Sequence, residues 1–186
     1  MMMAHAEEIQ GFKVGWPVED YFKLMAEEGD LSALLDRVDD KDVVDYVCGI
    51  AYASDPLSPG GSEWFTLKVD KQKCPNDVLF SMAGMLVNTN DGFVGINSMT
   101  MDKDGSMMVY PPAYDAGTEE NNELCSHIPG PACEGTSGNK QAGPGEGYVH
   151  IHSGFHGVGK DLSEAGYDWR NPVAEVLFGK PTWVNK

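Results

Sequence analysis

The sequence predicts a mainly β protein, an antiparallel β-sandwich or barrel with one or two short helices near its N-terminus. Helical patterns are confined to the first quarter of the 186 residues. Beyond them, short apolar segments alternate with turn-forming residues, which is typical of antiparallel sheets. The length suits a single domain of ordinary size.

Two short helices are expected before residue 40. Trp16-Pro17 opens a segment in which apolar residues recur at helical spacing as far as Met25, and Gly29 ends it. Asp30 can cap a second helix. The apolar residues of that helix again share one face: Leu31, Leu34, Leu35 and Val38.

Short strands are expected in the rest of the chain. The segment 78–87 is almost continuously apolar and therefore suits a buried central strand. Asp102–Gly105 predicts a hairpin turn, and the polar stretch Ala113–Gly147 a long loop that a disulfide or a metal ion would pin. The expected strands are Trp64–Val69, Val78–Val87, Phe93–Met101, Met107–Tyr110, Tyr148–His152 and Val173–Phe178.

The net charge of −16, from 29 acidic and 13 basic residues, excludes several partners. Nucleic acids and anionic membrane surfaces both require clustered Lys and Arg. No apolar run is long enough to cross a membrane, so membrane insertion is not expected. The excess acid serves either solubility or the binding of a cation by converging carboxylates.

Four cysteines match no zinc or redox spacing. Cys125 and Cys133 bracket a short loop rich in Pro and Gly, where a covalent link compensates for the lack of regular structure. We expect these two to form a disulfide, and Cys48 and Cys74 to pair by elimination. The alternative is four free thiols in a cytosolic protein.

Two acidic segments follow predicted strands and could supply oxygen ligands to calcium. They are Asn88–Gly92 and Asp115–Glu120. Calcium takes six to eight hard oxygen ligands, mostly carboxylates and carbonyls of loops. These segments would form a site if they lie at the same end of the sandwich. Acidic loops are also common in any chain of this charge.

A second group of candidate ligands is the histidine cluster His150, His152 and His156. Residues two apart in a strand point to the same face, so the first two could chelate one ion. Imidazole suits zinc or copper rather than calcium. The alternative, which we favour, is that the three rings are neutral and hold loops through hydrogen bonds.

No catalytic pattern stands out in the chain. Ser153 lies next to the histidines, and Asp168 could complete a triad, but no strained nucleophile turn surrounds the serine. Glu119 and Glu120 are adjacent carboxylates whose side chains have no reason to face one substrate. We therefore expect a protein that is not an enzyme.

Four ordered motifs resemble those of the spondin N-terminal domain family, in particular the stand-alone form found in microbes. The resemblance spans nearly the whole chain, and the helical segment 16–30 is similar as well. The motifs are MLVNTNDGFVG at 85–95, YDAGTE at 114–119, EGYVHIH with GFHG at 146–157, and YDWRNPVA at 167–174.

The resemblance implies a C2-like β-sandwich with calcium at one end of its sheets. By position in the motifs, the ligands would be Asp91, Asp115 and Glu119, the last of which is Asp in the animal form. The family normally begins with a strand that has no counterpart before Met1–His5. Residues 1–186 would then be a single spondin-like domain without that strand, which would also explain why no secretory signal is visible.

The expected function is that of a secreted, calcium-binding module for extracellular binding or adhesion, in which the ion is structural. Its partner would be an extracellular protein or polysaccharide. The alternative function is binding of copper or zinc by His150, His152 and His156.

Overall fold

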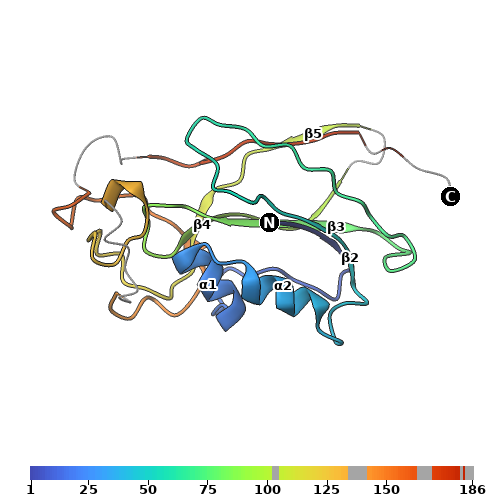
Figure 1. Cartoon of the computed structure of the whole chain (residues 1–186), viewed down its shortest axis with the longest axis horizontal. Coiled ribbons are helices and arrows are strands. Elements are labelled where there is room, and N and C mark those ends of the chain that lie inside the picture. The colour runs from blue at the N-terminus through green and yellow to red at the C-terminus, as the bar shows by residue number, and fades with distance from the viewer. Residues whose placement is uncertain (102–104, 134–141, 163–168, 181, 183–186) are drawn as a thin grey trace.

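The computed structural model describes residues 1–101, 105–133, 142–162, 169–180 and 182. At its centre is a six-stranded antiparallel sheet in the order β2-β1-β3-β4-β6-β7. Helices α1 and α2 lie on one side of this sheet, and the two-stranded sheet β5-β8 lies on the other (Figure 1). The mainly β, sandwich-like fold with two short helices is therefore confirmed.

The elements in chain order are β1 (Met2–His5), α1 (Asp20–Glu28), α2 (Ser32–Asp39), β2 (Val47–Ala51), β3 (Leu79–Met85), β4 (Gly92–Thr100), β5 (Met107–Val109), β6 (Ala113–Asp115), the 3-10 turn η1 (Pro131–Cys133), β7 (His150–Ile151) and β8 (Val176–Phe178).

The core between α1 and the sheet is built on aromatic side chains. The fully buried ring of Phe93 in β4 lies 5.0 Å from that of Phe12 and 4.9 Å from that of Phe22, measured between ring centroids. Gly95 makes this packing possible, because a Cβ atom there would lie 2.8 Å from the Phe12 ring. Met25 and Ala26 of α1 complete the cluster.

A second core lies between the other face of the sheet and β5-β8. Phe80 of β3 and Phe178 of β8 pack edge to face, with ring centroids 5.8 Å apart. Ala4 and Ile96 are buried beside them. Consecutive residues of β3 serve the two cores in turn, since Met82 packs in this one and Ala83 in the α1 core.

The end of α1 and the start of α2 lie where the sequence indicated, whereas α1 begins only at Asp20, after the segment that Trp16-Pro17 opens. Gly29 caps α1 with a positive φ of 71°, and its N–H donates to the Met25 carbonyl at 3.1 Å. The Asp30 carboxylate then accepts a hydrogen bond from the Ser32 N–H at 2.8 Å, at the start of α2.

Several expected strands differ from the observed ones. Trp64–Val69 is not a strand, because the backbone of 62–70 forms no ladder with another described segment. Leu67 and Val69 do pack into the core, whereas Trp64 is 79 % exposed. The alternation of apolar and polar residues in this segment arises because one side of the chain packs on the core, although its backbone is not paired with another strand. The expected turn Asp102–Gly105 lies, except for its last residue, outside the described residues.

Three strands carried no recognised signal. Met2–His5 becomes β1, a central strand between β2 and β3. Val47–Ala51 becomes β2, and the beginning of the expected long loop, Ala113–Asp115, becomes β6. These segments are short, and their pairing depends on neighbours that are distant in the chain.

The two expected disulfides are both present, and no cysteine is free. One joins Cys48 of β2 to Cys74 and the other joins Cys125 to Cys133. Paired cysteines of this kind persist in oxidising compartments and are typical of extracellular proteins. Among the described helices, none has the length and apolar character needed to cross a membrane.

Replacing Cys125 and Cys133 together by Ser should lower the free energy of unfolding by about 2–3 kcal/mol, because the unfolded chain regains the conformational entropy that closing this short loop removes. The separation is 8 residues, against 26 for the other pair. The Cys48→Ser/Cys74→Ser variant should therefore lose slightly more. Urea unfolding of the two variants and the wild type measures both losses, and an unchanged midpoint for either variant would contradict the prediction.

Candidate metal centre

Three polar residues lie side by side where β4, β6 and β7 meet. Asp91 immediately precedes β4, Asp115 ends β6 and His150 begins β7. In the ladders, Asp115 is paired with Gly92 on one side and with His150 on the other. The antiparallel register thus gathers residues that are up to 59 positions apart in the chain.

Asp91 is fully buried, and the described residues offer hydrogen bonds to only one of its carboxylate oxygens. Its Oδ2 accepts from the Thr118 N–H at 2.6 Å, the Glu119 N–H at 3.0 Å and the Thr118 hydroxyl at 3.1 Å. Its Oδ1 has no hydrogen-bond partner within the described part of the chain. A buried carboxylate oxygen without a donor is costly unless a cation or water completes it.

Asp115 is also fully buried, and it organises the loop that follows β6. Its Oδ1 accepts from the Gly117 N–H at 2.7 Å, and its Oδ2 accepts from the Asn121 side-chain amide. Gly117 has a φ of +71° and leaves no room for a side chain, since a Cβ there would lie 2.4 Å from the Tyr148 carbonyl oxygen. This close approach fixes the loop against the residues just before β7.

Asp115, Glu146 and His150 form a group whose ligand atoms all lie within 4.8 Å of one another. Asp115 is buried, His150 is half-buried and Glu146 is exposed, so the group opens to solvent on one side. His150 Nδ1 lies 3.7 Å from Asp115 Oδ1. Two carboxylates and one imidazole can hold a divalent metal ion, and the donor types admit more than one metal.

Glu146 is the ligand that the sequence analysis did not single out. It stands four residues before His150, within the quoted motif EGYVHIH. Gly147 follows it with a φ of +81°, and its N–H donates to the Gly117 carbonyl at 2.8 Å. This hydrogen bond joins the Glu146 turn to the loop after Asp115, a contact that the spacing of the chain does not reveal.

Burial raises the pKa of Asp91 to about 7, and the neighbouring charge of Asp115 adds to the shift. Hydrogen bonds from Thr118 and Glu119 act in the opposite direction without cancelling it. Near neutral pH, Asp91 therefore exchanges a proton readily in the absence of a cation, and a divalent ion at this position would replace that proton.

Glu119 is buried, but its carboxylate is placed differently from those of Asp91 and Asp115. Its Oε1 accepts from the Ala142 N–H at 3.1 Å. Burial raises its pKa to about 7, and the charge of Glu27 in α1 adds to the effect. Of the three carboxylates expected to bind calcium, the structure brings Asp91 beside Asp115. Only Asp115 belongs to the group with Glu146 and His150, and both Asp91 and Glu119 lie outside it.

The three histidines take part in separate interactions. His152 is buried, its Nδ1 accepts from the Gly154 N–H at 3.0 Å, and its ring packs 5.0 Å from that of Trp169. Burial lowers the pKa of His152, which keeps the ring neutral near pH 7. The His156 ring bonds to the Ser153 hydroxyl at 2.9 Å. Only His150 belongs to the group of three ligands.

The Ser153–His156 contact pairs a hydroxyl with an imidazole at an exposed position. The third residue considered for a triad, Asp168, lies outside the described residues. The contact spans three positions of one loop, and a local hydrogen bond that holds the loop is enough to account for it.

All four motifs behind the family resemblance supply residues to this end of the sheet. Asp91, Asp115 and His150 come from the first three. Asn171 comes from the fourth, and its side-chain oxygen accepts from the Ala113 N–H at 2.7 Å. Comparison with models of known protein families and with curated proteins finds no match. The family resemblance therefore rests on the motifs themselves.

The Asp91 pKa predicts an unusual pH dependence for the metal-free protein. Between its ordinary value of 3.8 and about 7, the folded protein holds a proton that the unfolded chain has released. Raising the pH through this range should therefore destabilise the fold, by at most about 1.4 kcal/mol per pH unit for this one proton. The Asp91→Asn variant has no titrating group at this position, so it should lack this part of the pH dependence of stability.

The measurement is urea unfolding in the presence of a chelator at pH 5, 6, 7 and 8. The stability of Asp91→Asn relative to wild type should rise with pH. Asp36→Asn, at an exposed position of α2, should follow the wild type throughout. Equal pH slopes for Asp91→Asn and wild type would show that Asp91 is not protonated in the fold.

Proposed function

We propose that this protein is an extracellular binding module whose β-sandwich is fixed at one end by a structural metal ion, and that the ion is calcium. The observation that carries the proposal is the buried Oδ1 of Asp91, which has no hydrogen-bond partner among the described residues and lies beside Asp115. Asp115 in turn has a ligand atom within 4.8 Å of those of Glu146 and His150. Two buried acids next to each other repel when both are ionised, and a bound cation would relieve that repulsion without a proton.

Calcium suits this position because carboxylate and carbonyl oxygens predominate there. Asp91, Asp115 and Glu146 would supply carboxylates, and backbone carbonyls of the loop 115–119 would supply further oxygens. Calcium accepts irregular sets of six to eight oxygens, whereas magnesium requires a tight octahedron and gives up its waters reluctantly. The resemblance to the spondin N-terminal domain family supports the same choice.

The ion would act on structure rather than on a substrate. Asp91 and Asp115 each also hold loop N–H groups, from Thr118, Glu119 and Gly117. An ion between these carboxylates and Glu146 would therefore tie the loop after β6 and the turn before β7 to the end of β4. Loops held in this way can present a constant surface to a partner.

An extracellular location is supported by the two disulfides, since such bonds are rare in reducing compartments. The net charge of −16 disfavours nucleic acid and anionic surfaces as partners. The partner would be an extracellular protein or polysaccharide.

Calcium at about 2 mM should raise the free energy of unfolding by about 1–2 kcal/mol over that of the chelated protein, the linkage expected for a site of extracellular strength. Asp115→Asn should lose this response, because it removes the ligand shared by the whole group. Asp36→Asn should keep it. Thermal melts with calcium, magnesium or chelator measure the effect, and an Asp115→Asn variant that responds like the wild type would refute the calcium site.

A second candidate is a transition metal, favoured by one observation: His150 contributes its imidazole nitrogen to the group of three ligands. Zinc or copper would bind this nitrogen, whereas calcium would not require it. Metal analysis of the purified protein decides between them. Stoichiometric zinc or copper that is lost in His150→Ala, and retained in His156→Ala, would replace calcium by a transition metal at Asp115, Glu146 and His150. Loss of the metal in His156→Ala as well would point instead to the histidine cluster expected from the sequence.

A further inference from the structure

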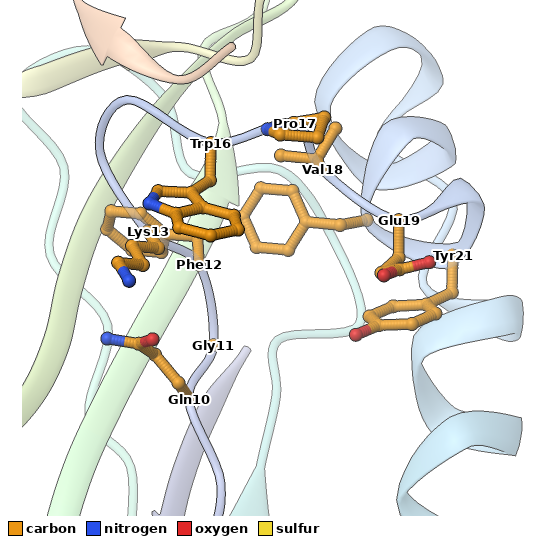
Figure 2. A pocket seen from close by; sticks show the side chains of 10 residues that line it. Gln10, Gly11, Phe12, Lys13, Trp16, Pro17, Val18, Glu19 and Tyr21 are labelled. Atoms are coloured by element: carbon orange, nitrogen blue, oxygen red, sulfur yellow. The ribbon is translucent and has the colours of Figure 1, made fainter.

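A groove of about 240 Å³ lies between the segment 10–18 and the start of α1 (Figure 2). Its floor is formed by the rings of Phe12 and Phe22, which also belong to the core. Trp16 forms one wall and is 57 % exposed, although the segment that carries it is well anchored. Tyr21 and Glu19 form the opposite wall (Figure 2).

The position of Trp16 is fixed by the backbone. The Gly15 N–H donates to the Val149 carbonyl at 2.7 Å, and the Val149 N–H donates to the Trp16 carbonyl at 2.9 Å. These bonds attach the segment to the residue that precedes β7. The groove therefore exists before any ligand arrives, and binding would not have to order it, which favours affinity.

The polar groups around the groove balance one another in charge. Lys13 brings one positive charge, with its Nζ 4.2 Å from the centre of the Trp16 ring system, and Glu19 brings one negative charge. Gln10 adds an amide that both donates and accepts hydrogen bonds. The groove thus combines an exposed indole, neutral hydrogen-bonding capacity and no net charge.

We infer that this groove binds a neutral saccharide. A sugar ring presents C–H bonds on its faces, which pack on an aromatic ring, and hydroxyls at its rim, which exchange hydrogen bonds with amide, carboxylate and ammonium groups. Sites for small molecules typically combine an aromatic surface with a few precisely placed polar groups. The volume suits one ring of a longer chain lying across the open groove.

Charge argues against the other ligands that an aromatic groove can take. A cationic ligand would be repelled by the positive charge of Lys13, whose Nζ lies 4.2 Å from the centre of the Trp16 ring system. A sulfated or uronic-acid chain would meet Glu19 and the field of a protein with a net charge of −16. A neutral sugar avoids both repulsions.

This inference deepens the proposed binding role by naming a ligand class, but it does not depend on which metal is bound or on whether one is bound. All the residues that line the groove lie between Gln10 and Phe22, and none of them belongs to the group Asp115, Glu146 and His150. Failure of the metal experiments would leave the groove unaffected, and failure of sugar binding would leave the metal site unaffected.

The test is native gel electrophoresis through gels that contain a polysaccharide, for which the high negative charge of the protein is an advantage. Laminarin, galactomannan and hydroxyethylcellulose serve as neutral polymers, and alginate as an anionic one. The wild type should be retarded by at least one neutral polymer and not by alginate. Trp16→Ala should weaken that retardation at least about tenfold, as expected for a central aromatic contact.

Two further variants interpret the result. Trp16→Phe keeps an aromatic surface and should bind more weakly than wild type but better than Trp16→Ala. Trp64→Ala removes a tryptophan that is 79 % exposed and lies outside the groove, so it should bind like wild type. Retardation by none of the neutral polymers, retardation by alginate alone, or unchanged binding of Trp16→Ala would each overturn the inference.

Discussion

Asp91, immediately before β4, and Asp115, at the end of the neighbouring strand β6, are fully buried, and the rest of this end of the molecule is arranged around their charge. Burial of two acids side by side opposes folding unless N–H donors, a proton or a cation offset the repulsion. The chain supplies the donors through Gly117, Thr118 and Glu119, but it leaves Oδ1 of Asp91 without one among the described residues. The raised pKa of Asp91 shows that burying its ionised carboxylate beside Asp115 remains unfavourable. A bound divalent ion would remove it.

The same arrangement extends to the groove through a short series of backbone contacts. The loop that wraps the carboxylates packs at Gly117 against Tyr148, and the next residue, Val149, holds the Trp16 segment by two hydrogen bonds. The indole wall of the groove is thus fixed to the strand that carries His150. The end of the sheet can in this way hold the groove beside the start of α1 in place, although none of its own side chains line the groove.

Local signals in the sequence were sufficient to predict the junction between the two helices. The pairing of strands that are distant in the chain could not be predicted in this way. Gly29 ends α1 through its own positive φ, and the Asp30 side chain accepts a hydrogen bond at the start of α2, so the junction between the helices was predicted correctly. Met2–His5 is a strand only because β2 and β3 flank it, and Trp64–Val69 alternates in polarity without pairing. At the candidate site, the motifs identified Asp91, Asp115 and His150 individually. The grouping with Glu146 depends on sheet register, and the placement of Glu119 depends on its contacts with Ala142 and Pro144. The spacing of residues encodes neither.

The central claim is that a divalent ion binds where β4, β6 and β7 meet. Crystals grown with calcium, measured at wavelengths that identify the ion by anomalous scattering, test it most directly. We predict a peak bound by oxygens of Asp115 and Glu146 at about 2.3–2.6 Å, with Oδ1 of Asp91 directed to the ion or to one of its waters. A clear map with no ion at these side chains, or an ion bound elsewhere while Asp91 Oδ1 is hydrogen-bonded only to water, would contradict the account.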